Sequence, residues 1–197
     1  MKETLRKKLA ASKRRLVLEE VSHLFENEGF HSLKMQDIAA RLEMSVGALY
    51  KLFASKEALY HAYVAFQIER FYDALEEACR DERDAFVCLA RYVRMKFDVF
   101  AQKRKAVEES AGNDALFFLK LHHRHHDPAE PIYNWLAERF KALSERAPLT
   151  ERHPLKTAYI FNAYTTGYIE YWLRYGEGIE TDEKDVVRRF LEGWRAF

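Results

Sequence analysis

Glycine and proline are scarce in this sequence, with seven and four residues among 197. So few turn-forming residues exclude a many-stranded sandwich and a glycine-rich nucleotide fold. No apolar run approaches the roughly 18–20 residues of a membrane span, and no apolar stretch follows the basic N-terminus as in a signal peptide. Leu, Ala, Glu, Lys and Arg dominate, and 48% of the residues are hydrophobic. The composition predicts a folded, all-α chain.

Cysteine is scarce as well: the sequence has only Cys79 and Cys88, whose spacing fits neither a metal site nor a disulfide framework. Two free cysteines are typical of a reducing compartment, so we expect a cytoplasmic protein. The sequence also lacks a nucleophile–base–orienter set, a phosphate-binding loop and a telling pair of carboxylates. It therefore predicts neither an enzyme nor a bound cofactor.

The charge is nearly balanced over the whole chain but not along it. A formal net charge of +1 excludes a generally basic nucleic-acid binder. Residues 1–57, however, hold 11 Lys/Arg against 8 Asp/Glu, while the remainder holds 21 against 23. Seven basic side chains lie in the first 15 residues. The pattern indicates a small positive end on a mildly acidic body.

Apolar residues recur with helical spacing near the N-terminus. The pattern predicts a helix over about 12–28 that ends at Gly29, and a short second helix over 35–42. Ser45 is a suitable N-cap for a third helix over 45–53. Two short helices joined by a tight turn are typical of a helix-turn-helix, and also of an ordinary αα-hairpin.

The remaining sequence predicts six more helices, about nine in total. We expect them over about 56–80, 86–102, 114–126, 129–147, 154–175 and 181–194. No internal repeat or low-complexity segment interrupts them.

Residues 29–59 resemble the DNA-binding module of the TetR (tetracycline repressor) family of bacterial transcription regulators. The matching positions are Gly29-Phe30, Asp37-Ile38-Ala39, Ser45, Gly47, Leu49-Tyr50, Phe53, Lys56 and Leu59. The resemblance implies a three-helix DNA-binding domain over 1–55 and a larger helical effector-binding and dimerisation domain over 56–197. It further implies a homodimeric, ligand-responsive repressor that binds a palindromic operator in double-stranded DNA and is not associated with a membrane.

Helical geometry divides the third helix into two faces. Leu49 and Phe53 share one face, whereas Gly47, Ala48 and Lys51 point the other way. Small residues with one cation suit a major groove, where Ala48 can touch a thymine methyl and Lys51 can donate to guanine. With the phosphate contacts that the resemblance implies, the expected DNA-binding residues are Lys34, Met35, Ser45, Val46, Gly47, Ala48, Tyr50, Lys51 and Lys56.

Three positions depart from the family pattern. Lys34 replaces the usual Ser or Thr cap, Leu42-Glu43 replaces a small Ala-Gly pair, and Leu52 replaces a backbone-contacting His or Tyr. We expect Glu43 to turn away from DNA, since a carboxylate would repel phosphates. The departures leave an alternative: a helical ligand- or metal-binding protein whose helix-turn-helix no longer reads DNA.

The resemblance also suggests positions for an effector and a dimer interface. The expected effector-binding residues are Tyr92, Met95, Phe117, Leu121, Tyr133, Asn162, Tyr164 and Tyr168, without a basic cluster that would indicate an anionic group. The expected dimerisation residues are Ala163, Gly167, Glu170, Phe190 and Trp194, although this face could instead pack within one subunit.

A run of histidines lies outside the family pattern. His122 and His126 are four residues apart on a predicted helix and could share a metal with Asp127 or His153. Histidines at a helix C-terminus are also favoured by the helix dipole without any metal. We therefore predict no metal site and keep His122 and His126 as weak candidates.

Overall fold

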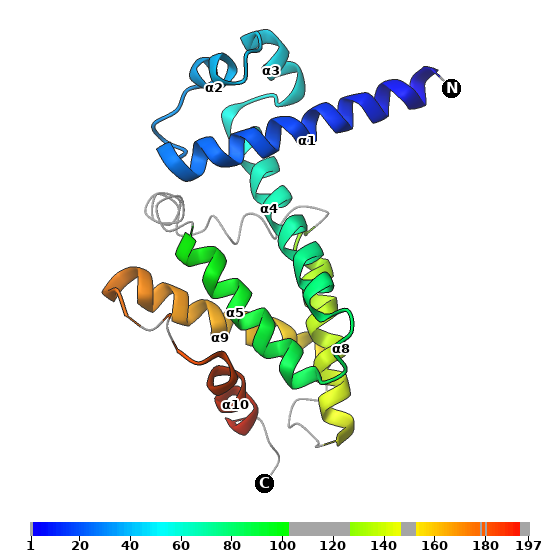
Figure 1. The fold of residues 1–197 in the computed structure, drawn as a ribbon, viewed down its shortest axis with the longest axis vertical. Helices are drawn as coiled ribbons and strands as arrows, with labels where there is room; N and C mark the ends of the chain where they lie inside the picture. The colour runs from blue at the N-terminus through cyan, green and yellow to red at the C-terminus, as the bar shows by residue number, and fades with distance from the viewer. Residues whose placement is uncertain (1, 103–126, 147–152, 178, 180, 194–197) are drawn as a thin grey trace. The chain divides into compact units, whose positions relative to one another are not determined.

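The computed structural model describes residues 2–102, 127–146, 153–177, 179 and 181–193 (Figure 1). These ranges contain eight helices and no strand, which confirms the all-α prediction. The helices are α1 (Lys2–Glu28), α2 (Met35–Arg41), α3 (Val46–Leu52), α4 (Lys56–Cys79), α5 (Ala85–Gln102), α8 (Glu130–Arg146), α9 (Pro154–Tyr175) and α10 (Glu183–Gly193). The helix expected over 114–126 lies outside these ranges. None of the eight is both long and apolar enough to cross a bilayer.

The described residues form two compact units, which we call the N-terminal unit (residues 2–68) and the C-terminal unit (residues 69–102 and 127–193). The division falls inside α4, whereas the family resemblance implies a domain boundary after residue 55. The first turns of α4 therefore belong to the core of the N-terminal unit, and its later turns to that of the C-terminal unit.

Helix α1 begins about ten residues earlier than the apolar stripe predicts. The additional segment contains no glycine or proline and is rich in Lys, Leu and Ala, which favour helix without needing a buried face. The C-terminal end agrees with the prediction: Gly29 has φ = 82° and its N–H donates to the Phe25 carbonyl at 3.1 Å.

Helices α2 and α3 are joined by a turn that includes one strained residue. Lys34 precedes α2 and provides no side-chain cap; instead the Asp37 carboxylate accepts from the Lys34 N–H at 2.9 Å. Glu43 has φ = 52°, the left-handed region that favours glycine. Ser45 caps α3, as expected, by accepting from the Ala48 N–H at 3.2 Å.

The core of the N-terminal unit is apolar and draws on all four of its helices. Phe25, Ile38, Leu49 and Leu59 have no exposed surface, and Phe53 is 1% exposed. Such residues fix α3 against α1, α2 and α4, since each buried side chain contributes roughly 1.5–3 kcal/mol.

In the C-terminal unit, α8 packs against α9, and α5 packs against α8 and α10 (Figure 1). The core includes Phe140, Phe161 and Phe190, whose rings lie 4.9–5.7 Å apart. Phe190 was expected at a dimer interface, but it is 4% exposed and packs inside its own subunit. The amphipathic pattern of α10 required a buried face and could not show which partner would cover it.

Candidate functional site

Helix α3 presents one face to solvent while the opposite face anchors it. Leu49 is fully buried, and Gly47, Tyr50 and Lys51 are exposed, with Tyr50 retaining 45% of its surface. An added Cβ at Gly47 would meet no heavy atom of the described chain within 4 Å. Nothing in the described part of the chain therefore requires glycine here, although glycine in a helix costs about 1 kcal/mol relative to alanine.

The other predicted DNA-binding residues differ in exposure. Lys34 and Ser45 are exposed, while Val46, Ala48 and Lys56 are partly buried. The Lys56 ammonium lies 4.3 Å from the centre of the Phe30 ring. Met35 is different, because it is 4% exposed and packs in the apolar core, so it offers almost no surface to a duplex.

A contact from α1 fixes the C-terminal end of α3. The Arg14 guanidinium donates to the Leu52 carbonyl at 2.5 Å and lies 4.2 Å from the centre of the Phe53 ring. Partial burial lowers the pKa of Arg14 below its ordinary value, but a guanidinium remains charged near neutrality. Arg14 is one of the seven basic side chains in the first 15 residues, and its 38-residue separation from Leu52 gave no signal of this contact in the sequence.

A buried polar cluster lies in the C-terminal unit. We call it the Lys96 cluster: Tyr92 and Lys96 from α5, Tyr133 from α8, and Asn162, Thr165 and Thr166 from α9. The Lys96 ammonium, on a residue that is 7% exposed, lies within hydrogen-bond distance of four oxygens, which share its three N–H donors: Asn162 O at 3.0 Å, Asn162 Oδ1 at 2.8 Å, Thr165 Oγ1 at 2.9 Å and Thr166 Oγ1 at 2.8 Å. All four are neutral oxygens.

Asn162 connects this ammonium to two tyrosines. The Tyr92 hydroxyl donates to Asn162 Oδ1 at 2.8 Å, and Asn162 Nδ2 donates to the Tyr133 hydroxyl at 3.0 Å. The structure therefore brings together three of the predicted effector-binding residues. Three other predicted effector-binding residues are partly buried: Met95, Tyr164 and Tyr168. The Tyr164 and Tyr168 hydroxyls lie 3.0 Å apart. The remaining two, Phe117 and Leu121, lie outside the described residues.

Burial determines the protonation behaviour of the Lys96 cluster. Desolvation lowers the pKa of Lys96 to about 7, and the more distant Glu170 carboxylate opposes this shift. Burial raises the pKa of Tyr133 to about 12 and raises that of Tyr92 further. Both hydroxyls therefore stay protonated, while the ammonium is the titrating group near neutrality.

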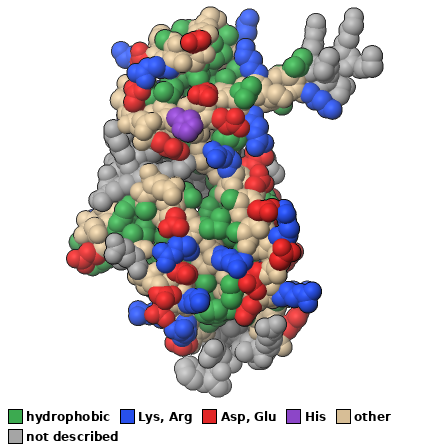
Figure 2. Space-filling model, viewed as in Figure 1, with side chains coloured by type: hydrophobic (Ala, Val, Ile, Leu, Met, Phe, Trp, Pro, Cys, Tyr) green, Lys and Arg blue, Asp and Glu red, His purple; other side chains and the backbone are tan. Residues whose placement is uncertain are grey.

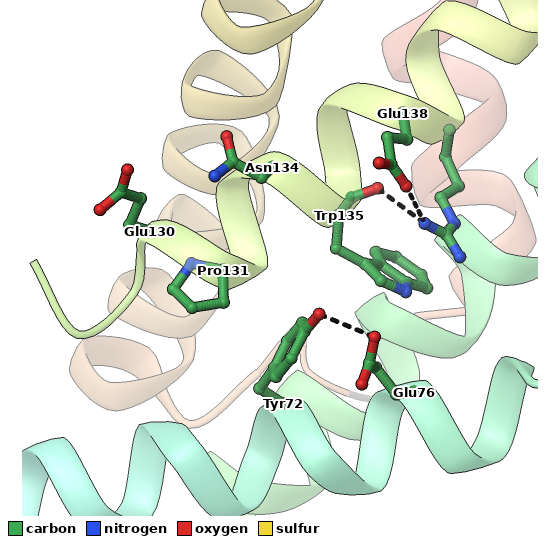
Figure 3. Close-up of a pocket in the computed structure, with 8 residues that line it drawn as sticks. Tyr72, Glu76, Glu130, Pro131, Asn134, Trp135 and Glu138 are labelled. Atoms are coloured by element: carbon green, nitrogen blue, oxygen red, sulfur yellow. Dashed lines mark hydrogen bonds and ion pairs between the residues drawn. The ribbon is translucent and has the colours of Figure 1, made fainter.

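A groove lies elsewhere in the C-terminal unit, between α4 and α8 (Figure 3). It has a volume of about 430 Å³ next to Tyr72, Glu76 and Trp135. Its polar groups largely bind one another: the Tyr72 hydroxyl donates to Glu76 at 2.7 Å, and the Arg139 guanidinium donates to Glu138 at 3.1 Å. None of the predicted effector-binding residues lines this groove.

One face of α9 exposes a stripe of aromatic and small side chains. Its members are exposed and recur every four residues: Leu155, Tyr159, Ala163, Gly167, Tyr171 and Tyr175. An added Cβ at Gly167 would meet no described heavy atom within 4 Å, and Glu170 is exposed beside the stripe. Trp194 lies outside the described residues.

On the face of the C-terminal unit in Figure 2, basic and acidic side chains are interspersed, so no patch of one charge marks a site there.

The weak metal candidates His122 and His126 lie outside the described residues. His153, considered as a further ligand, caps α9 by accepting from the Lys156 N–H at 3.4 Å. Across the described part of the chain, no three His, Cys, Asp or Glu side chains are placed to hold a metal ion together.

Comparisons with known proteins agree with the arrangement of α1 to α4. Residues 17–63 match the family model described as bacterial regulatory proteins, tetR family. The HTH-type transcriptional regulator UidR of Escherichia coli K12 is 24% identical over 186 residues, covering 91% of this chain and 88% of UidR.

Solved structures share the fold over nearly the full length. A TetR-family transcriptional regulator from Pectobacterium atrosepticum superposes with a TM-score of 0.68 at 15% identity, covering 94% of this chain and 92% of its own. The regulator FadR from Bacillus subtilis, solved with stearoyl-CoA, gives a TM-score of 0.68 at 15% identity, covering 89% and 94%. Residues 17–63 are therefore similar to the DNA-binding module of tetR-family regulatory proteins, and the chain as a whole shares the all-helical fold of solved TetR-family regulators.

Proposed function

We propose that this regulator is a homodimeric repressor that binds a palindromic operator through α3 and releases it when a small molecule occupies the C-terminal unit. The observation that carries the proposal is the division of α3: Leu49 is fully buried while Gly47 and Lys51 face solvent. A short helix anchored on one side and free on the other can enter a major groove.

The side chains on the DNA-facing side of α3, and Lys56 at the start of α4, suit distinct roles on DNA. Gly47 allows close approach of the backbone to a duplex, which gives a reason for a glycine that the chain itself does not require. Ala48 can contact a thymine methyl, and Lys51 can donate to guanine O6 and N7. Tyr50 and Lys56 are suited to phosphate contacts that hold the register without reading sequence.

The exposed stripe on α9 supports a dimer. Ala163 and Gly167 let a second helix approach closely, and Tyr159 and Tyr171 supply apolar area on either side. A two-fold arrangement would place the two α3 helices about 34–36 Å apart, in successive major grooves of one DNA face. Palindromic operators follow from that symmetry.

The Lys96 cluster supports an effector site in the C-terminal unit. Polar groups that converge within an apolar helical core are typical of small-molecule sites. The Bacillus subtilis FadR structure shows that a regulator of this fold can hold an organic ligand, stearoyl-CoA. An effector would release the operator only by binding the DNA-free conformation more tightly than the DNA-bound one.

The experiment that tests the proposal is selection of bound duplexes from a random DNA library by the full-length protein, at several salt concentrations. We expect a two-fold symmetric consensus and an affinity that falls steeply with salt. A Leu49→Ala variant, whose α3 has lost its anchor, is the control and should enrich nothing. Failure of the wild-type protein to enrich any sequence would favour the alternative, a helical ligand-binding protein that does not read DNA.

A further inference from the structure

In the described part of the C-terminal unit, the buried Lys96 ammonium has no carboxylate at ion-pair distance, and Glu170 acts on it only at longer range. Lys96 is 7% exposed, and among the described residues no ion pair joins its ammonium to a carboxylate. Its four hydrogen-bond acceptors are neutral amide and hydroxyl oxygens. Burying a charge is unfavourable unless it is paired, and an apolar residue of similar volume commonly gives a more stable core. Core stability alone therefore does not account for a lysine at this position.

Asn162 occupies the place that an anionic oxygen would take in this cluster. Its Oδ1 accepts from two donors at 2.8 Å each, the Tyr92 hydroxyl and the Lys96 ammonium. An amide oxygen carries only a partial negative charge, so it satisfies the hydrogen bonds without neutralising the ammonium. Rotation of the Asn162 side chain would free the Tyr92 hydroxyl and one acceptor position at the Lys96 ammonium, which would keep its contacts to the Asn162 carbonyl, Thr165 and Thr166.

Asn162 and Thr166 are the partly exposed members of the cluster. Tyr92, Lys96, Tyr133 and Thr165 are buried, so a ligand would have to approach the cluster from the side of Asn162 and Thr166. The Tyr92 hydroxyl and the Lys96 ammonium then offer donors from adjacent turns of α5. Two or more converging donors, one of them charged, are the recognition elements that a carboxylate requires.

We propose that the Lys96 cluster binds the carboxylate group of an organic effector, with the Lys96 ammonium as counter-charge and the Tyr92 hydroxyl as second donor, in place of the Asn162 side-chain oxygen. This inference rests on the proposed effector-responsive function and specifies the chemical class of the effector. Only the negatively charged form of the ligand supplies the missing counter-charge.

The ionisation of the cluster gives the proposal a pH signature. The pKa of Lys96 is about 7, lowered by desolvation, so the free protein loses the ammonium as the pH rises above neutrality. Tyr92 on α5 and Tyr133 on α8 keep their protons because burial raises their pKa values, and Glu170 on α9 is a more distant carboxylate. Affinity for a carboxylate should therefore fall by up to about tenfold per pH unit above neutrality.

The test measures the thermal stability of the full-length protein with matched probes: hexanoate, decanoate and 4-phenylbutyrate against the corresponding primary alcohols at millimolar concentration and constant ionic strength. We expect at least one carboxylate to raise the Tm and its alcohol to raise it far less. Lys96→Met should lower the affinity for that carboxylate at least about tenfold, while Lys141→Met, which removes an exposed lysine on α8, should leave it unchanged.

A second variant covers the case in which Lys96→Met does not fold. Asn162→Asp places a carboxylate inside the cluster without changing the side-chain shape, so it should raise the Tm of the free protein and abolish the effect of the carboxylate probes. Equal stabilisation by alcohols and carboxylates would overturn the inference, as would no stabilisation by any carboxylate. Duplex binding by the same preparations separates the two proposals, because a protein that selects an operator but ignores carboxylates refutes only the inference.

Discussion

The two units differ in where their proposed functional groups lie: on the surface in the N-terminal unit and inside the core in the C-terminal unit. In the N-terminal unit the core is apolar, and the residues proposed to act on DNA, such as Tyr50 and Lys51, lie on the surface. In the C-terminal unit the charges are mixed on the face that Figure 2 shows, and the most distinctive polar group, Lys96, lies inside. A surface site can change with little effect on folding, whereas a site inside the core is coupled to stability and protonation.

The largest expected effect concerns the apolar core of the N-terminal unit. Leu18→Ala should lower the free energy of unfolding by about 2–4 kcal/mol, because Leu18 is 7% exposed and its removal leaves a cavity. Leu16→Ala, two residues away on α1 at 62% exposure, should change it by less than about 0.5 kcal/mol. Chemical denaturation measures both, and similar losses in the two variants would contradict the assigned core.

Because Lys96 lies in the core of the C-terminal unit, the free energy of unfolding should depend on pH in a way that an apolar core would not produce. The pKa of Lys96 is about 7 when folded against an ordinary 10.5, so between these values the unfolded chain binds more protons and stability rises with pH. The contribution is up to about 1 kcal/mol per pH unit. Comparing denaturation of the wild type and Lys96→Met across this range isolates it, and identical pH profiles would show that Lys96 titrates normally.

Two changes, one on α3 and one at the start of α4, should affect DNA binding in different ways. Lys51→Ala should weaken binding by about 1–3 kcal/mol and relax the base preference at one position, because this side chain is proposed to read a base. Lys56→Ala should weaken binding to all sequences alike and lower the salt slope by about one. Duplex selection with each variant separates these outcomes, and an unchanged consensus for Lys51→Ala would exclude direct readout by Lys51.

A smaller effect is expected where α1 holds the end of α3. Arg14→Ala removes the hydrogen bond to the Leu52 carbonyl and the cation–π contact with the Phe53 ring. The free energy of unfolding should therefore fall by about 1–2 kcal/mol. Lys13→Ala removes the same charge from an exposed position without these contacts and serves as the matched control. Equal unfolding midpoints for both variants would indicate that the Arg14 contact contributes nothing.

The smallest expected effect is an increase in stability. Glu43 adopts φ = 52°, and Glu43→Gly relieves a left-handed conformation at the cost of a more flexible unfolded chain. The net effect should be a stabilisation of up to about 1 kcal/mol. Thermal unfolding measures it, with Glu43→Ala as a control that keeps the strain; a gain in the alanine variant instead would implicate the carboxylate charge.

The same contrast between surface and core explains what the sequence predicts. The periodicity of α3 places Leu49 inside and Lys51 outside, because one short amphipathic helix leaves little choice. Lys96 was within reach of sequence reasoning, since it is a cation four residues after Tyr92 in an otherwise apolar stripe of α5. Its partners Asn162 and Thr165 lie more than 60 residues away, and no local pattern specifies such a contact.

Two further residues show where periodicity stops. Met35 and Phe190 both lie on amphipathic helices, and both were expected at surfaces that bind a partner. Each is buried instead, because a hydrophobic stripe indicates that a side chain is covered and not what covers it. The residues that bury Met35 and Phe190 are known only from the packing of α2 and α10 within their units.

The most direct test of the central claim is a fluorescence anisotropy titration of the full-length protein on the selected palindrome, on its half-site and on a scrambled duplex, across a salt series. The account predicts tight, strongly salt-dependent binding of the palindrome, far weaker binding of the half-site and only non-specific binding of the scrambled duplex. Equal affinity for all three duplexes would contradict the proposal that two α3 helices read the operator together.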